Sequence, residues 1–142
     1  MTDRIPVALT IAGSDPSGGA GIQADLKTFH QFGVYGEAVI TLLTVQNTLS
    51  VERVECLAPD LIERQIRCVV EDIPPRVAKT GALGNRAIIE TVARLAQEFP
   101  FPLLVDPVML SKHGAPLLEP DACDVLRTVL LPRAYLLTPN LP

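Results

Sequence analysis

Short apolar runs alternate with amphipathic stretches along the chain. The apolar runs predict strands, and they cover residues 6–12, 38–45, 51–57, 76–80, 102–106 and 134–138. In the amphipathic stretches, apolar residues recur every three or four positions, which predicts helices over residues 19–32, 59–72, 85–98 and 121–131. Apolar and polar residues alternate within residues 51–57, a pattern typical of a half-exposed strand at the edge of a sheet.

The order of these elements predicts the fold class. Strands that alternate with helices of about 10–15 residues form βαβ units, in which the strands run parallel and the helices cover the sheet. We therefore predict an α/β fold, a three-layer sandwich with a mostly parallel central sheet. No linker, repeat or low-complexity segment interrupts residues 1–142, a length typical of one domain.

Polar residues and glycines gather where the predicted strands end. These ends carry Ala12-Gly13, Gln46-Asn47, Thr80-Gly81, Asp106-Pro107 and Thr138-Pro139-Asn140, whereas the strand interiors are apolar. Ligands of open parallel sheets bind beyond the carboxyl ends of the strands. We therefore expect a ligand site along this edge.

Composition narrows the class of ligand. Apolar residues make up 48% of the chain, enough for a sizeable core, and the net charge of −4 argues against a nucleic-acid partner. Four Phe and two Tyr with no Trp are too few for the stacking platforms that bind single-stranded nucleic acids. No apolar run approaches the ~20 residues of a membrane span, so we expect no membrane partner.

The cysteines and the N-terminal residues indicate the cellular compartment of the protein. Cys56, Cys68 and Cys123 lie far apart, without CxxC spacing or a nearby His pair, which indicates buried free thiols rather than a zinc site or a disulfide framework. The N-terminal apolar stretch is too short for a signal peptide. We therefore predict a cytoplasmic protein.

Residues 12–25, AGSDPSGGAGIQAD, place three glycines within four positions after the first predicted strand. Gly13 and Gly18 have the spacing of a P-loop, but Gly19 and Ala20 stand where its lysine and its hydroxyl residue belong. Residues 19–24 fit the dinucleotide motif G-x-G-x-x-A. They begin about six residues after the strand, however, and no acidic residue ends the second strand. Both phosphate-binding motifs are thus incomplete.

Two other interpretations of this stretch remain. In the first it is a flexible turn before a helix, and Asp25 lies near the helix start, where the helix dipole favours a carboxylate as in a capping residue. In the second it is the wall of a pocket. Glycines let a flat ligand approach the backbone, and Asp25 can accept a hydrogen bond from a ring amine or a hydroxyl. We favour the pocket wall.

Five ordered segments make the prediction specific. They are ALTIAGSDPSGGAGIQADLKTF, VYGEAVITLLTVQNT, AKTGALG, VDPVMLSKHGAPLL and LLTPNLP. In this order and spacing they resemble hydroxymethylpyrimidine/phosphomethylpyrimidine kinase, a thiamine-biosynthesis enzyme of the ribokinase-like superfamily, from about residue 6 to residue 142. The resemblance implies that ATP, with Mg²⁺, phosphorylates the small-molecule substrate 4-amino-5-hydroxymethyl-2-methylpyrimidine and then its monophosphate.

The resemblance also implies a substrate site. The aminopyrimidine would contact Gly13, Asp25 and Gln46, with Val108 as an apolar wall. An aminopyrimidine edge carries a donor beside an acceptor, and the Gln46 amide can pair with both. The alternative for Gln46 is a cap at the end of a strand.

Four further positions follow from the same resemblance. Ala82 and Lys112 are candidates for the pocket or its lid. Ala82 stands where the family commonly has methionine, and its smaller side chain would loosen the apolar wall. Lys112 could equally be a solvated lysine. Asp106 and Asn140 would lie on the side of Mg²⁺ and the phosphates. Their alternative is a turn, because Asp-Pro and Pro-Asn are common turn dipeptides.

The resemblance covers only the N-terminal half of the family's chain. The later Gly-Thr-Gly-Cys segment, which supplies the anion hole and the residue that activates the hydroxyl, is not among residues 1–142. We therefore expect these residues to be the substrate-binding half of a single ribokinase-like domain, with no catalytic residue of their own and inactive alone. A bare apolar strand at 134–138 would favour a homo-oligomer, a dimer. Two alternatives stay open: an enzyme similar to pyridoxal kinase, or a non-catalytic module that binds a pyrimidine.

Overall fold

Six strands form one sheet in the computed structural model, which describes residues 5–111 and 114–140. In spatial order they are β3 (Val51–Cys56), β2 (Tyr35–Gln46), β1 (Val7–Ser14), β4 (Val77–Thr80), β5 (Leu103–Val105) and β6 (Leu136–Leu137). All neighbours run parallel except β3, which pairs antiparallel with β2 at one edge. The predicted α/β class, the mostly parallel sheet and the edge position of residues 51–57 are confirmed.

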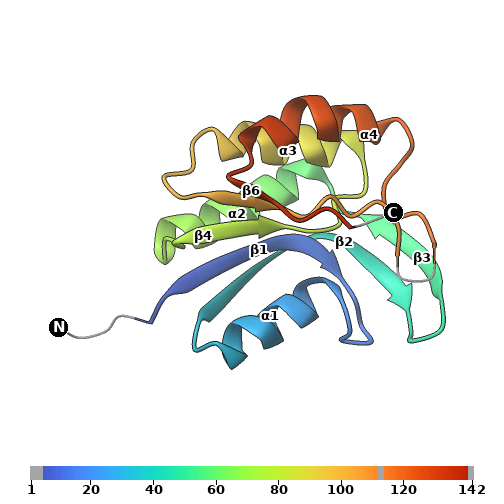
Figure 1. Cartoon of the computed structure of the whole chain (residues 1–142), viewed down its shortest axis with the longest axis horizontal. Coiled ribbons are helices and arrows are strands. Elements are labelled where there is room, and N and C mark those ends of the chain that lie inside the picture. The colour runs from blue at the N-terminus through green and yellow to red at the C-terminus, as the bar shows by residue number, and fades with distance from the viewer. Residues whose placement is uncertain (1–4, 112–113, 141–142) are drawn as a thin grey trace.

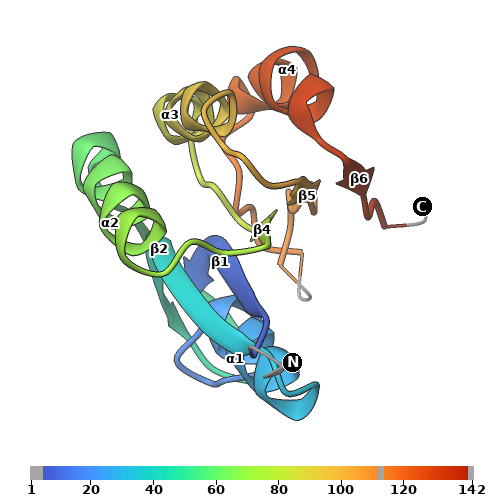
Figure 2. The ribbon, with the colours of Figure 1, turned by 90° about the vertical axis from the view of Figure 1, so that its left-hand side faces the viewer.

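Helices cover both faces of this sheet. The helix α1 (Gly21–Gln31) lies against one face, next to β1 and β2 (Figure 1). On the other face lie α2 (Pro59–Asp72), α3 (Arg86–Ala96) and α4 (Ala122–Val125) (Figures 1 and 2). The three layers of the predicted sandwich are therefore present.

The main core lies between the sheet and helices α2 to α4. It is made of apolar side chains that the sequence periodicity turns inward, among them Leu9, Ile11, Ile62, Ile88, Ile89 and Val92, all fully buried. Burying a side chain of this size stabilises the fold by about 1.5–3 kcal/mol. Asn85 is the N-cap of α3, and its side chain accepts a hydrogen bond from the Ile88 N–H at 3.0 Å.

The helical periodicity over residues 19–32 places Ile22, Leu26, Phe29 and Phe32 on one side, and this prediction is correct except at its end. Ile22 is buried, and a Cβ on Gly36 of β2 would press against Leu26 and Phe29, so the helix sits close to the strand. Phe32, by contrast, is 78% exposed. The helix ends at Gln31, so the periodicity no longer holds at residue 32.

Three expectations need correction. The helix predicted at 121–131 is a four-residue α4 followed by a π-helical turn, Leu126–Leu130, and a short 3₁₀ turn, Leu131–Arg133. Pro132 lacks the N–H that would continue an α-helix. The strand predicted at 134–138 is only the two residues of β6. The three cysteines are free, as expected, but none is fully buried: Cys68 is exposed, and Cys56 and Cys123 are only partly buried.

The sheet positions a ligand site where its strand order reverses. The α1 connection takes the chain from β1 to β2 on one side, whereas α3 takes it from β4 to β5 on the other. A crevice forms at such a reversal, beyond the carboxyl ends of the two central strands. Here those strands are β1 and β4. Within residues 5–111 and 114–140, no helix is both long and apolar enough to cross a membrane.

Candidate functional site

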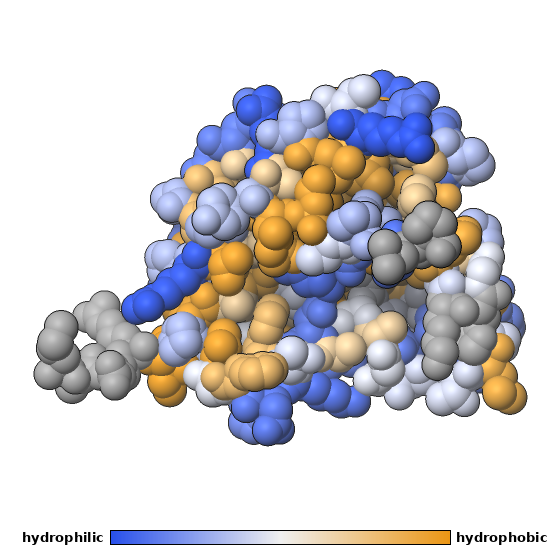
Figure 3. All heavy atoms as spheres, viewed as in Figure 1, coloured by the Kyte–Doolittle hydropathy of each residue, from blue (hydrophilic) through white to orange (hydrophobic). Residues whose placement is uncertain are grey.

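A cavity of about 410 Å³ lies in this crevice, which is within the usual range for small-molecule pockets. Its walls come from the end of β1 and the glycine-rich turn, from the ends of β2 and β4, and from the segment after β5. In the space-filling view the region between α1 and the upper helices is hollowed and mixes polar with apolar residues (Figure 3).

Most of the predicted site residues meet at this cavity. Those that line it are Gly13, Asp25, Gln46, Ala82, Asp106 and Val108. Asn140 does not line the cavity and is exposed, three residues beyond the end of β6. Lys112 lies outside the described residues. The roles inferred for these residues stay predictions.

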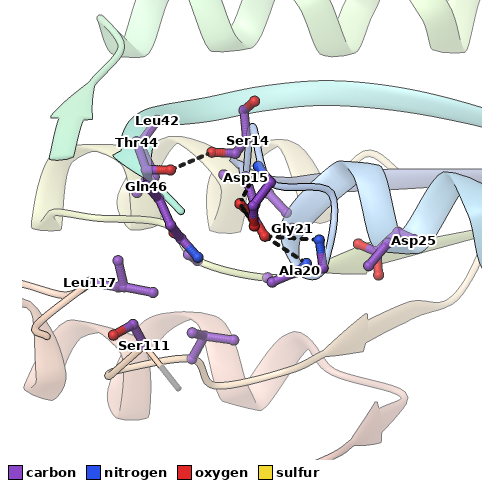
Figure 4. A pocket seen from close by; sticks show the side chains of 18 of the residues that line it. Ser14, Asp15, Ala20, Gly21, Asp25, Leu42, Thr44, Gln46, Ser111 and Leu117 are labelled. Atoms are coloured by element: carbon purple, nitrogen blue, oxygen red, sulfur yellow. Dashed lines mark hydrogen bonds between the residues drawn. The ribbon is translucent and has the colours of Figure 1, made fainter. Parts of the chain in front are cut away.

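The glycine-rich turn is built around the carboxylate of Asp15. One carboxylate oxygen accepts hydrogen bonds from the backbone N–H of Ser17 at 2.8 Å and from its hydroxyl at 2.7 Å. The other accepts from the N–H groups of Gly19 at 3.0 Å and Ala20 at 2.8 Å (Figure 4). Burial raises the pKa of Asp15, but these hydrogen bonds outweigh it and hold the pKa below its usual value.

This geometry separates the turn from a phosphate loop. A phosphate loop directs its N–H groups at the ligand, whereas those of Gly19 and Ala20 are directed at Asp15. Gly21 has a φ of +57°, and a Cβ there would collide with the carbonyl oxygen of Gly13. The turn is therefore a closely packed wall that requires glycine, not a flexible connection.

Asp25 is held by an ion pair and a hydroxyl. The Lys79 ammonium of β4 donates to both of its carboxylate oxygens at 2.9 Å, and the Thr10 hydroxyl of β1 donates to one of them at 2.6 Å. The side chains of Lys79 and Asp25 are only 23% and 17% exposed. The capping interpretation of Asp25 is therefore wrong: residue 20 is the N-cap of α1, and Asp25 bonds to the sheet instead.

Asp106 follows β5 and belongs to the same charged end of the cavity. Burial raises the pKa of its carboxyl, Lys79 lowers it and Asp25 raises it further, so that the pKa lies above its usual value. Gln46 lies at the opposite end. Figure 4 shows Gln46 and Asp25 on either side of the glycine-rich turn. The cavity thus has an amide end and a charged end.

Sequence reasoning missed three of the residues that shape this site. The sequence pattern assigns no role to Asp15, Thr10 or Lys79. The available signal was a polar side chain inside a buried apolar strand. Thr10 stands between Leu9 and Ile11, and burying such a group requires a partner.

Comparisons with known proteins agree with the resemblance. A family model described as phosphomethylpyrimidine kinase matches residues 15–142. The hydroxymethylpyrimidine/phosphomethylpyrimidine kinase of Bacillus subtilis is 50% identical over 136 residues, which are 95% of this chain and 50% of that protein. The chain spans about half the length, or less, of the other curated relatives that it matches as well.

Solved structures extend this similarity to the fold. The crystal structure of phosphomethylpyrimidine kinase from Clostridium difficile matches with a TM-score of 0.89 and 51% identity, over 96% of this chain and 60% of that one. The pyridoxal kinase of Staphylococcus aureus, in complex with AMP-PCP and pyridoxal, matches with a TM-score of 0.84 and 36% identity, over 97% of this chain and 49% of that one. The predicted ribokinase-like fold is confirmed.

Proposed function

Because the chain belongs to the phosphomethylpyrimidine kinase family, we propose that residues 1–142 form the acceptor-substrate half of a hydroxymethylpyrimidine/phosphomethylpyrimidine kinase. The observation that carries the proposal is the cavity at the strand-order reversal, with its amide end and its charged end. Its volume suits one small ring with a substituent.

The two ends suit the two ends of an aminopyrimidine alcohol. At one end the Gln46 amide can donate to a ring nitrogen and accept from the exocyclic amine. At the other end Asp25 can accept from the hydroxymethyl group. Val108 and Ala82 supply apolar surface between the two ends. A site that pairs the polar groups of its ligand rejects analogues that lack them.

ATP and Mg²⁺ belong to the proposal. The AMP-PCP in the Staphylococcus aureus pyridoxal kinase supports a nucleotide donor. Mg²⁺ is usually held by one or two carboxylates together with phosphate oxygens, and the Asp106 carboxylate at the charged end is a hard oxygen ligand of this kind. Asn140 is the other candidate on the phosphate side. Among the described residues there is no group of three or more His, Cys, Asp or Glu side chains placed to hold a metal.

The remaining expectations also become proposals. Residues 1–142 expressed by themselves should bind the pyrimidine but turn it over far more slowly than the longer relatives, since phosphoryl transfer needs donors placed around the moving phosphate. A coupled assay of ATP consumption tests this. We also propose a cytoplasmic location. We further propose a dimer, because Leu136 and Leu137 of β6, and Tyr135 just before it, are exposed. Sedimentation as a monomer would contradict the dimer.

Calorimetric titration with 4-amino-5-hydroxymethyl-2-methylpyrimidine tests the substrate proposal. The Gln46→Ala variant should bind at least about tenfold more weakly, because two paired groups of the ring lose their partner. Gln97→Ala, at the exposed end of α3, is the matched control and should bind like the unaltered chain. No binding to the unaltered chain, or equal binding by both variants, would argue against the proposed site.

A pyridoxal kinase activity is the second candidate, because the pyridoxal complex of the Staphylococcus aureus enzyme matches 97% of this chain. Titration with pyridoxal under the same conditions separates the two. We expect tighter binding of the pyrimidine, since its amine gives the Gln46 amide a donor and an acceptor side by side. Tighter binding of pyridoxal would favour the second candidate.

A further inference from the structure

Lys79 supplies the positive charge at the charged end of the cavity. Among the described residues that line the cavity, it is the one Lys or Arg, whereas Asp15, Asp25 and Asp106 are all acidic. Asp15 is occupied by the glycine-rich turn. Lys79 therefore balances the charge of Asp25 and faces the field of Asp106.

The hydrogen bonds that Lys79 makes to Asp25 leave one N–H donor of its ammonium for a ligand. An ammonium has three N–H donors, and Lys79 directs two bonds at Asp25. Thr10 provides a further bond to Asp25, so the carboxylate remains held when Lys79 directs a proton elsewhere. Thr10 and Lys79 are also direct neighbours in the register of β1 and β4, which fixes their spacing.

The backbone beside Lys79 leaves room for an approaching group. Residue 81 is glycine, and a Cβ there would lie 3.6 Å from the Lys79 nitrogen and 2.8 Å from the Cβ of Ala12. A larger residue would narrow this side of the cavity, next to the ammonium. The lysine is thus both partly buried and open to the cavity on this side.

The two proposed acceptors differ in the charge that they bring to this end. The alcohol is neutral there, whereas its monophosphate carries about two negative charges near neutral pH. A dianion that enters among carboxylates needs a cation, and a lysine binds phosphate as a point charge.

We propose that Lys79 binds the phosphate of the monophosphate acceptor and so determines the preference of the site for the phosphorylated over the unphosphorylated substrate. In the empty site Lys79 pairs with Asp25. With the monophosphate bound, its ammonium donates to a phosphate oxygen, while Thr10 keeps Asp25 in place. This inference rests on the proposed function.

The test is the ratio of two dissociation constants, for the alcohol and for the monophosphate, measured by calorimetry on residues 1–142. In Lys79→Met this ratio should shift at least about tenfold against the monophosphate, the effect of losing one charge-assisted hydrogen bond. Lys79→Arg should restore most of the ratio. Arg86→Met, which removes one charge from exposed α3, is the control and should leave the ratio unchanged.

Removing Lys79 alone leaves the Asp25 carboxylate without its cation, which destabilises a partly buried site. The double variant Asp25→Asn with Lys79→Met removes both charges. Because Asp25 is itself proposed to contact the alcohol, this double variant is compared with Asp25→Asn alone, and the ratio should shift against the monophosphate between these two variants as well. An equal loss of both ligands, or an unchanged ratio in both comparisons, would overturn the role of Lys79. If the unaltered chain binds the alcohol but not the monophosphate, the proposed role of Lys79 is also wrong, whereas the proposed function stands. If it binds neither, the proposed function itself fails.

Discussion

Replacing Asp15 with Asn tests whether the glycine-rich turn depends on a carboxylate. Asp15 is only 4% exposed, and its two oxygens accept four hydrogen bonds, three of them from backbone N–H groups. Asn has nearly the same shape but offers one oxygen and one donor nitrogen. The substitution therefore changes the hydrogen bonding of the turn and leaves its packing almost unaltered.

The expected cost follows from these bonds. If the Asn oxygen stays on Ser17, the amide nitrogen faces the N–H donors of Gly19 and Ala20, and both bonds are lost. If the amide flips, the N–H of Ser17 loses its acceptor instead. A hydrogen bond to a charged group contributes about 1.5–3 kcal/mol. We therefore expect Asp15→Asn to lower the free energy of unfolding by about 2–4 kcal/mol at pH 7.

Urea unfolding followed by far-ultraviolet circular dichroism measures this change. Asp121→Asn is the matched control, because Asp121 is exposed at the start of α4 and its side chain makes no capping hydrogen bond. The control should change the free energy of unfolding by less than about 0.5 kcal/mol. A loss at Asp15 no larger than that of the control would refute the role given to the carboxylate.

The pH dependence provides a second check on the same variant. The pKa of Asp15 is lowered in the folded chain, so its contribution is present above the ordinary aspartate pKa and is lost as the pH falls through the folded value. The difference between the unaltered chain and Asp15→Asn should therefore be largest near neutral pH and shrink below about pH 4. A difference that stays constant down to pH 3 would contradict the reasoning.

Two further predictions concern stability. Gly21→Ala should lower the free energy of unfolding by more than about 2 kcal/mol, because residue 21 has a positive φ and a Cβ there collides with the Gly13 carbonyl. Gly33→Ala is also at positive φ but in open space, and it should lower the free energy by only about 1 kcal/mol. Thermal unfolding measures both changes. Glu37→Gln should raise the free energy of unfolding by about 1 kcal/mol at pH 7, because burial and then Asp72 raise the pKa of Glu37. That gain should shrink as the pH falls and vanish below about pH 4, where Glu37 is protonated in both the folded and the unfolded state, and a gain independent of pH would contradict it.

Much of the fold follows from local pattern in the sequence. The apolar runs and the helical periodicity predict every strand, and they predict α1 to α3, because each signal lies within one element. The predictions fail where another residue or another element decides. Phe32 fits the α1 periodicity but lies beyond the last residue of that helix, and Pro132 disturbs the helix that begins with α4.

The site was harder to predict than the fold, because its contacts join distant parts of the chain. Asp25 and Lys79 are 54 residues apart in sequence, and they meet only because β4 pairs with β1 in a register that sets Lys79 beside Thr10. The sequence places Asp25 near a helix start but cannot show which strand faces that helix. The resemblance identified Gly13, Gln46, Val108 and Asp106 as candidates without this register, because a motif match needs no contact map.

The glycine-rich turn and Lys79 have different roles in the cavity: the turn forms a stable wall, and Lys79 is proposed to bind phosphate. The two roles can be measured separately. The N–H groups of Gly19 and Ala20 are bonded to Asp15, so a phosphate in the cavity has to find its donor elsewhere. Asp15→Asn should therefore change stability while leaving the ratio of the two dissociation constants close to that of the unaltered chain. Substitutions at Lys79 should change that ratio. If Asp15→Asn shifted the ratio as much as Lys79→Met, the turn itself would contact the phosphate, and the wall would have to be reinterpreted as a cradle.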